Sequence, residues 1–182
     1  MRGISLYRNI LCMTAVVMAL FMGTALAVPR AMTVDDAVIA GIAPGSALSY
    51  VRSIYGEPDG EKTKRTGNYP THLVDYYGEG FVITYDIFGG AQNPLIQSIE
   101  STNAALVMPS GIHVGMKIAE VQQIFSDIQE PFRRDEKNNQ YTSPRFYVEV
   151  SDEKKGIRTV VFDVDKKGVI QKIFIYDQYG ID

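Results

Sequence analysis

The sequence predicts an α+β protein built from two copies of one unit, each a short helix packed on an antiparallel β-meander. The two copies are expected to form one continuous sheet. Three observations support this prediction. The segments 41–55 and 111–125 align without a gap and share glycines and apolar residues at the same positions. Alternating apolar runs joined by short loops follow each segment, which is typical of an antiparallel meander. The segment 169–173, VIQKI, repeats the segment 95–99, LIQSI, so each copy extends to its final strand.

The first 27 residues have the features of a secretory signal peptide. Arg2 and Arg8 form a positive start, an apolar run follows from Ile10, and residues 25–27, Ala-Leu-Ala, are typical of a cleavage site. Because the apolar run approaches the roughly 20 residues of a membrane-spanning helix, an uncleaved anchor is the alternative. The sequence therefore predicts a chain that starts at Val28 after cleavage and is secreted or periplasmic.

Composition restricts the classes of function. Cys12 is the only cysteine and lies early in the apolar run, after Leu11, which does not resemble a lipid-attachment site. Cleavage would leave a chain without disulfides or thiolates, so its fold must depend on its core. The remaining chain carries 16 basic and 21 acidic residues, a net charge of −5, without a basic stripe. Nucleic acid is therefore not expected as a partner. A second long apolar segment is absent from the sequence, so no membrane span is expected after cleavage.

The first copy, residues 28–108, begins with a lead-in whose Asp35-Asp36 pair predicts exposure. A helix is expected over 47–55, with Ser46 as its N-cap and an apolar stripe at i, i+3, i+6 and i+7. That stripe is Leu48, Val51, Ile54 and Tyr55. Strands are expected at 71–77, 81–88 and 95–102, and 59–68 reads as a loop or an exposed edge strand.

The second copy, residues 109–182, contains a helix expected over 117–125 and a polar segment, 127–143, expected to be a mobile loop. Alternation predicts that its helix covers one set of strand side chains, which become the core. That set is Phe146, Val148, Val150, Val160, Phe162 and Val164. The strands themselves are expected at 145–151, 158–165 and 169–176.

Motifs for catalysis and metal binding are weak. No G-x-S-x-G elbow or P-loop occurs. His72 and His113 are the only histidines, and although His72 lies near Asp75, no paired ligand spacing is present. Residues 163–168, D-V-D-K-K-G, imitate the start of a calcium loop, but the following ligand positions are wrong and a hairpin turn fits better. The sequence thus predicts no catalytic residue, metal or cofactor.

Tyrosines are the most suggestive feature. A helix on one side of each meander leaves the other face of the sheet open, and exposed aromatics on a sheet are typical interface anchors. Tyr76 and Tyr77 must point to opposite faces, so one of them is expected on the open face. Ordinary two-sided packing, with the hydroxyls at the rim, is the alternative. The residues expected to bind a partner are Tyr76, Tyr77, Phe88, Tyr147, Arg145 and Arg158.

The segment Gly111-x-x-x-Gly115-Met116-x-Ile118-x-Glu120-Val121 resembles the SmpA/OmlA family of small bacterial outer-membrane-assembly lipoproteins. The doubled unit looks like the tandem-repeat fold of β-lactamase inhibitor protein. The chain departs from this pattern in two ways: Lys117 stands where a Ser or Thr helix cap is usual, and the lipid-attachment cysteine is missing. The resemblance therefore implies a shared architecture more than a shared function.

Two functions remain open on this basis. The leading hypothesis is a non-enzymatic binding or assembly module that contacts another envelope or extracellular protein through the open sheet face. The alternative is a cell-envelope hydrolase or small-ligand-binding protein with a pocket between the copies. An exposed aromatic sheet face favours the first hypothesis, and a deep polar pocket with clustered acids favours the second.

Overall fold

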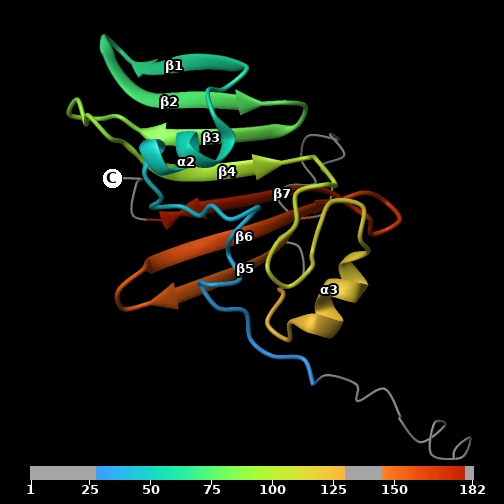
Figure 1. Cartoon of the computed structure of the whole chain (residues 1–182). Coiled ribbons are helices and arrows are strands. Elements are labelled where there is room, and N and C mark those ends of the chain that lie inside the picture. Colours follow the sequence, from blue (N-terminus) through green and yellow to red (C-terminus); the bar gives the residue numbers. More distant parts are fainter. Residues whose placement is uncertain (1–27, 130–144, 179–182) are drawn as a thin grey trace, which may run out of the picture.

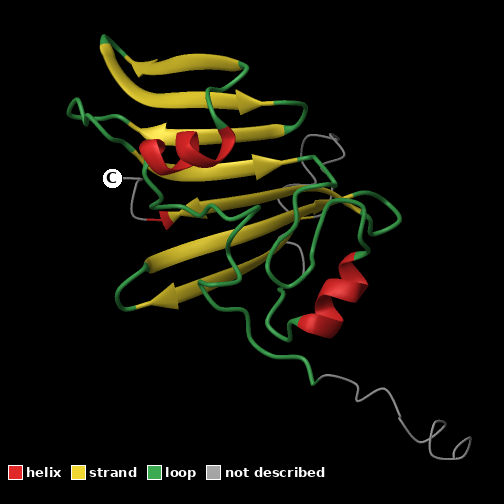
Figure 2. Cartoon of the chain, viewed as in Figure 1, coloured by secondary structure: helices red, strands yellow, loops and turns green. Residues whose placement is uncertain are grey.

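The computed structural model describes residues 28–129 and 145–178, which form an α+β fold around one antiparallel sheet of seven strands (Figure 1). The strand order is β1-β2-β3-β4-β7-β6-β5, which confirms the continuous sheet and pairs β4 with β7 at its centre. Two helices accompany the sheet in this part of the chain (Figure 2). The elements are α2 (Leu48–Tyr55), β1 (Gly60–Thr66), β2 (Tyr69–Tyr77), β3 (Phe81–Asp86), β4 (Leu95–Ser101), α3 (Ile118–Ile124), β5 (Arg145–Asp152), β6 (Gly156–Val164) and β7 (Ile170–Asp177).

The segment 59–68, for which a loop and an edge strand were both open, contains the edge strand β1. Residues 61–66 are all exposed, and Lys62, Lys64 and Arg65 lie among them. Charged side chains on an edge strand oppose pairing with other chains, which suits an outermost strand. The predicted signal segment 1–27, and the part of the predicted mobile loop from 130 to 143, lie outside the described residues.

Helix α2 lies across β3 and β4 in Figure 1 and packs on one face of the sheet, which we call the covered face. Val51 is fully buried, and Leu48 and Tyr55 pack against the core. Ile54, predicted to share their stripe, is instead 46% exposed. At roughly 100° per residue it lies about 120° around the helix from Leu48, too far to face the same surface.

The N-cap of α2 also differs from the prediction, whereas that of α3 agrees with it. Ser46 does not cap α2, because its hydroxyl accepts a hydrogen bond from the backbone N–H of Ala43 at 3.3 Å and Ala47 takes the N-cap position. At α3 the N-cap is Lys117, whose backbone N–H donates to Glu120 at 3.0 Å. Glu120 therefore supplies an acceptor, and a negative charge, in the first turn of a helix whose cap residue is a cation.

The predicted core of the second half is confirmed: five of its six side chains are buried and Phe146 packs against them. The lead-in, expected to be exposed, also belongs to this core. We call residues 30–46 the strap, because they hydrogen-bond to both halves of the chain and bury apolar side chains in the core. The buried apolar residues of the strap are Met32, Val34, Ala37, Ile39 and Ile42.

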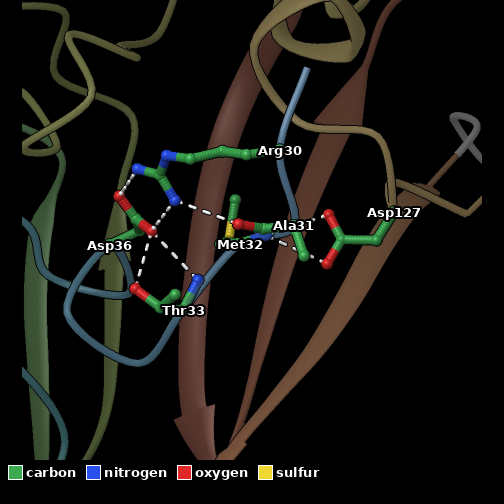
Figure 3. Close-up of polar contacts among 6 residues, drawn as sticks. All are labelled: Arg30, Ala31, Met32, Thr33, Asp36 and Asp127. Atoms are coloured by element: carbon green, nitrogen blue, oxygen red, sulfur yellow. Dashed lines mark hydrogen bonds and ion pairs between the residues drawn. The ribbon is translucent and has the colours of Figure 1, made fainter. Parts of the chain in front are cut away.

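Polar contacts hold the start of the strap in place (Figure 3). Arg30 donates to both carboxylate oxygens of Asp36 at 2.7 Å, and Thr33 adds its backbone N–H and hydroxyl at 2.9 Å. The Arg30 hydrogen bond, helped by Thr33, lowers the pKa of Asp36 to about 2 although the carboxyl is buried. Asp127, beyond α3, accepts the backbone N–H of Met32 at 3.0 Å. These contacts explain why Asp36 is buried rather than exposed.

Tyr77, predicted as a partner-binding residue, lies on the covered face. Its side chain is 8% exposed, and its ring centroid lies 5.6 Å from that of Tyr55 and 6.2 Å from that of Phe81. This aromatic group fills the space under the C-terminal end of α2. Of the Tyr76/Tyr77 pair, Tyr76 is therefore the member on the open face.

Arg158, also predicted as a partner-binding residue, lies on the covered face as well. It has the same parity in β6 as the buried Val160, two residues away. Its guanidinium donates to the backbone carbonyl oxygens of Val34 at 3.0 Å and Pro44 at 2.8 Å. The Arg158 side chain thus holds the strap at two points ten residues apart, so its role is structural.

Backbone contacts where each helix begins are closely matched. The N–H of Gly45 donates to the carbonyl oxygen of Ile96 at 2.8 Å, and the N–H of Gly115 donates to that of Ile170 at 2.9 Å. Both glycines have positive φ, 87° and 98°, a conformation that favours glycine. Each helix is thereby joined to the first residues of the last strand in its own half.

Each of these last strands also contains a register shift at the same place. The ladder skips Gln97 in β4, between the pairs of Ile96 and Ser98, and it skips Gln171 in β7. A bulge lets two residues three positions apart face the same side, which is why Ile96 and Ile99 are both buried. Beyond the bulge in β7, alternate side chains turn to the open face.

Candidate functional site

The face of the sheet opposite the helices, which we call the open face, carries a hollow of about 970 Å³. Side chains from β2 and from the four adjacent strands β4, β7, β6 and β5 line it. The hollow therefore crosses the central β4–β7 pair, where the two halves of the sheet meet. Its lining combines aromatic rings, carboxylates and cations, which is typical of a binding surface.

Strand register arranges the lining side chains in three parallel rows across the strands. Residues directly opposite each other in an antiparallel pair lie on the same face, so each row is continuous from strand to strand. The charged row is Arg145–Asp163–Lys172, the aromatic row is Tyr147–Val161–Phe174–Glu100, and the acidic row is Glu149–Thr159–Tyr176–Ser98.

Ion pairs connect the charged row to the end of the aromatic row. Arg145 Nε lies 2.9 Å from Asp163 Oδ1, and Lys172 Nζ lies 3.5 Å from Asp163 Oδ2. Lys172 Nζ also lies 3.3 Å from Glu100 Oε2. Two cations and two carboxylates thus alternate across four strands. Their charges cancel, and the arrangement holds each side chain in place at the margin of the hollow.

The aromatic row gives the hollow an apolar floor. Phe174 and Tyr176 follow one another on the open side of β7, with ring centroids 5.2 Å apart and planes tilted by 31°. Tyr147 and Val161 continue this floor towards β5. Half-buried rings of this kind can pack on an apolar side chain or receive a cation over their faces.

The acidic row is compensated differently. Glu149 accepts a hydrogen bond from the side-chain amide of Gln178 at 2.9 Å, and the same amide nitrogen lies 3.0 Å from the hydroxyl of the buried Thr159. Within residues 28–129 and 145–178, no ion pair joins Glu149 to a cation. The hollow is therefore neutral on one side of its aromatic floor and negative on the other.

The six residues predicted to bind a partner fall into three groups. Arg145 and Tyr147 line the hollow. Tyr76 lies on the open face farther out, where Lys62 Nζ is 5.5 Å from its ring centroid, and Phe88 lies in the β3–β4 loop, 72% exposed. Tyr77 and Arg158 lie on the covered face, as described above. The structure thus brings two of the six together.

The partner-binding residues predicted from the sequence do not include those at the centre of the hollow, which are Lys172, Phe174 and Tyr176 of β7. Alternation along β7 would place them opposite Ile173 and Ile175, so the signal was present in the sequence. It was obscured by the bulge at Gln171, which makes Ile170 and Ile173 face the same side three residues apart.

A second group of ionisable side chains lies under α2 on the covered face. Asp75 is fully buried, and Arg52 Nη2 lies 3.4 Å from its Oδ2. Burial raises the pKa of Asp75, and the positive charge of Arg52 opposes that rise. Burial also raises the pKa of Tyr85, which lies on the same face in β3. Because His72 lines the hollow on the other face, His72 and Asp75 do not form a metal site together.

Among the described residues, no cluster of three or more His, Cys, Asp or Glu side chains is arranged to hold a metal ion. Within the same ranges, no helix is both long and apolar enough to span a membrane. Neither a protein-family model, nor a curated protein, nor a solved structure matches the chain.

Proposed function

We propose that this chain is a non-enzymatic binding or assembly module that holds a segment of another protein in the open-face hollow. The observation that carries the proposal is the aromatic floor of Tyr147, Phe174 and Tyr176, bordered by the charged row. Aromatic anchors supply most of the binding energy at protein interfaces, and charges at the rim set orientation and register. The hollow combines both features on one rigid sheet.

A small-ligand function is the second candidate, because the hollow has the size of a ligand pocket. Its volume of about 970 Å³ is near the upper end of the roughly 300–1,000 Å³ typical of small-molecule sites. Four carboxylates line it, as the hydrolase alternative requires, but Glu100 and Asp163 are engaged in ion pairs with cations. Such pairing favours recognition over general acid catalysis, so we place the protein partner first.

The proposal includes a two-copy architecture, residues 28–108 and 109–182. Its support is the matched contacts of Gly45 and Gly115 and the matched bulges at Gln97 and Gln171. The β4–β7 register also supports two copies. The LIQSI and VIQKI segments lie 74 positions apart, and adding 74 to a β4 residue while subtracting 74 from its β7 partner turns one pair of this register into another. Those pairs are Ile99↔Ile175 and Ser101↔Ile173, with Glu100↔Phe174 between them. A single rigid-body superposition of the first half on the second must then place α2 on α3 and β4 on β7. If the helices and the strands need two different superpositions, the repeat is refuted.

The proposal also includes export, to the periplasm or to the outside of the cell, and an envelope or extracellular partner. It rests on the signal-like features of residues 1–27 and on the architecture suggested by the SmpA/OmlA resemblance. Intact mass measurement of the protein from its source cells is expected to give a chain beginning at Val28 without an acyl group. A retained N-terminus, or a lipid on Cys12, would contradict this part.

Photocrosslinking at the hollow tests the binding function. A benzophenone amino acid replaces Tyr147, and a control protein carries it at Tyr50, which is 49% exposed on α2. We expect one adduct protein at position 147, lost when Phe174→Ala is added and absent at position 50. Native mass spectrometry of the purified protein decides between the candidates. A bound small molecule, with no position-specific protein adduct, would favour the second function.

A further inference from the structure

We infer that the segment held in the hollow is basic: it places a Lys or Arg side chain against Glu149, beside the rings of Tyr147 and Tyr176. This inference rests on the proposed binding function and specifies the chemistry of the partner. It follows from an imbalance between the two sides of the aromatic floor.

The two sides of the aromatic floor differ in net charge. The described lining residues include four carboxylates and two cations, so the hollow carries a net charge of −2 with His72 neutral. Arg145 and Lys172 are both committed to Asp163, and Lys172 also to Glu100, so that side is neutral. Of the other two carboxylates, Asp177 has the parity of the covered-face Ile175 and lies opposite Arg158, so the surplus charge on the open face belongs to Glu149, on the opposite side of the floor.

Glu149 is the less compensated of these two carboxylates. Asp177 lies opposite Arg158 in the β6–β7 register and lies within the electrostatic influence of that guanidinium. Glu149 receives a neutral amide hydrogen bond from Gln178. An arriving ammonium or guanidinium group would therefore gain a charged partner at Glu149 without breaking an ion pair already described.

The neighbouring rings make this a position for a cation rather than for any polar group. Tyr147 precedes Glu149 by two residues on the same face of β5, and Tyr176 lies in the same row across β6. A Lys or Arg has an aliphatic stem that packs on apolar surface while its charged end stays at a carboxylate. Aromatic faces attract such cations as well. The apolar floor then receives a second, uncharged side chain of the same segment.

Selection from a library of random 12-residue peptides displayed on phage tests this inference. On the wild-type protein we expect enrichment of peptides with Lys or Arg near an apolar residue. On Glu149→Lys the preference is expected to reverse to Asp or Glu. Glu79→Lys, in the exposed β2–β3 turn and outside the hollow lining, is the matched control and should select the same peptides as the wild type.

Affinities of one selected peptide complete the test. Fluorescence anisotropy should show about two- to fivefold weaker binding to Glu149→Gln, the upper part of the range for an exposed ion pair, and no change for Glu79→Gln. Peptides that enrich without a charge preference, or with the same preference on Glu149→Lys, would overturn the basic-segment inference while leaving the binding function in place. Failure of any peptide to enrich, together with no adduct at position 147, would overturn both.

Discussion

Arg158 in β6 and Arg145 in β5 have the same charge and lie on opposite faces of one sheet. Arg158 donates to two backbone carbonyl oxygens of the strap, whereas Arg145 is 67% exposed and forms an ion pair with Asp163. On the covered face, Arg158 therefore supplies hydrogen bonds to carbonyl groups of the buried strap residues Val34 and Pro44. The open face holds its cations in a solvent-facing row, where they contribute little stability and stay accessible to a partner.

The tyrosine pair of β2 gives the largest expected difference between the faces. Tyr77→Ala removes a buried ring that packs on Tyr55 and Phe81, and is expected to lower the free energy of unfolding by about 3–5 kcal/mol. Tyr76→Ala, one residue earlier on the open face, is expected to cost about 1 kcal/mol or less. Urea unfolding of both variants measures the difference. Equal losses would show that the open face is part of the core.

The two arginines give the next largest difference. Arg158→Met keeps much of the side chain's length but leaves two strap carbonyls without their donor, so we expect a loss of about 2–3 kcal/mol. Arg145→Met breaks an exposed ion pair and is expected to cost about 0–1 kcal/mol. The same unfolding measurement, repeated in high salt, should leave the first loss nearly unchanged and shrink the second.

How far the sequence predicted this fold depends on which interactions create each part. Periodicity predicted both helices, the six strands β2 to β7 and the core of the second half, because one buried face leaves a regular pattern of apolar residues; it left β1, which is polar throughout, open between a strand and a loop. It did not predict the strap, because Asp36 reads as a solvated residue until Arg30 and Thr33 surround its carboxylate. Only tertiary contacts turn that charge into a buried group.

The site was predicted in part for a similar reason. Arg145 and Tyr147 follow from simple alternation along β5 and do line the hollow. Arg158 was assigned to the open face although it has the parity of Val160, because an arginine suggests solvent more strongly than position does. Phe174 and Tyr176 were missed because a bulge at Gln171 interrupts the alternation that would have placed them.

Acid sensitivity gives a smaller test of the same contrast. The folded-state pKa of Asp36 is lowered from 3.8 to about 2, so its contribution is present above pH 4 and is lost as the pH falls towards 2. The stability lost by Asp36→Asn is expected to be about 1–2 kcal/mol at pH 5 and to decrease towards pH 2.5. Asp35→Asn, at the exposed neighbouring carboxylate, is the control and should cost little at either pH. A pH-independent Asp36→Asn effect would mean that the carboxylate charge is not what holds the strap.

Phe88 gives the smallest expected change in stability and the sharpest limit on the extent of the site. Its side chain is 72% exposed in the β3–β4 loop, outside the hollow lining, and its backbone N–H already bonds Asp86 at 2.8 Å. Phe88→Ala is therefore expected to change the free energy of unfolding by no more than about 0.5 kcal/mol. If the partner extends beyond the hollow towards this loop, crosslinking from position 147 should fall in Phe88→Ala, but less than in Phe174→Ala. Unchanged crosslinking would confine the binding site to the three rows between β4 and β5, and a large loss of stability would show that the loop packs on the sheet.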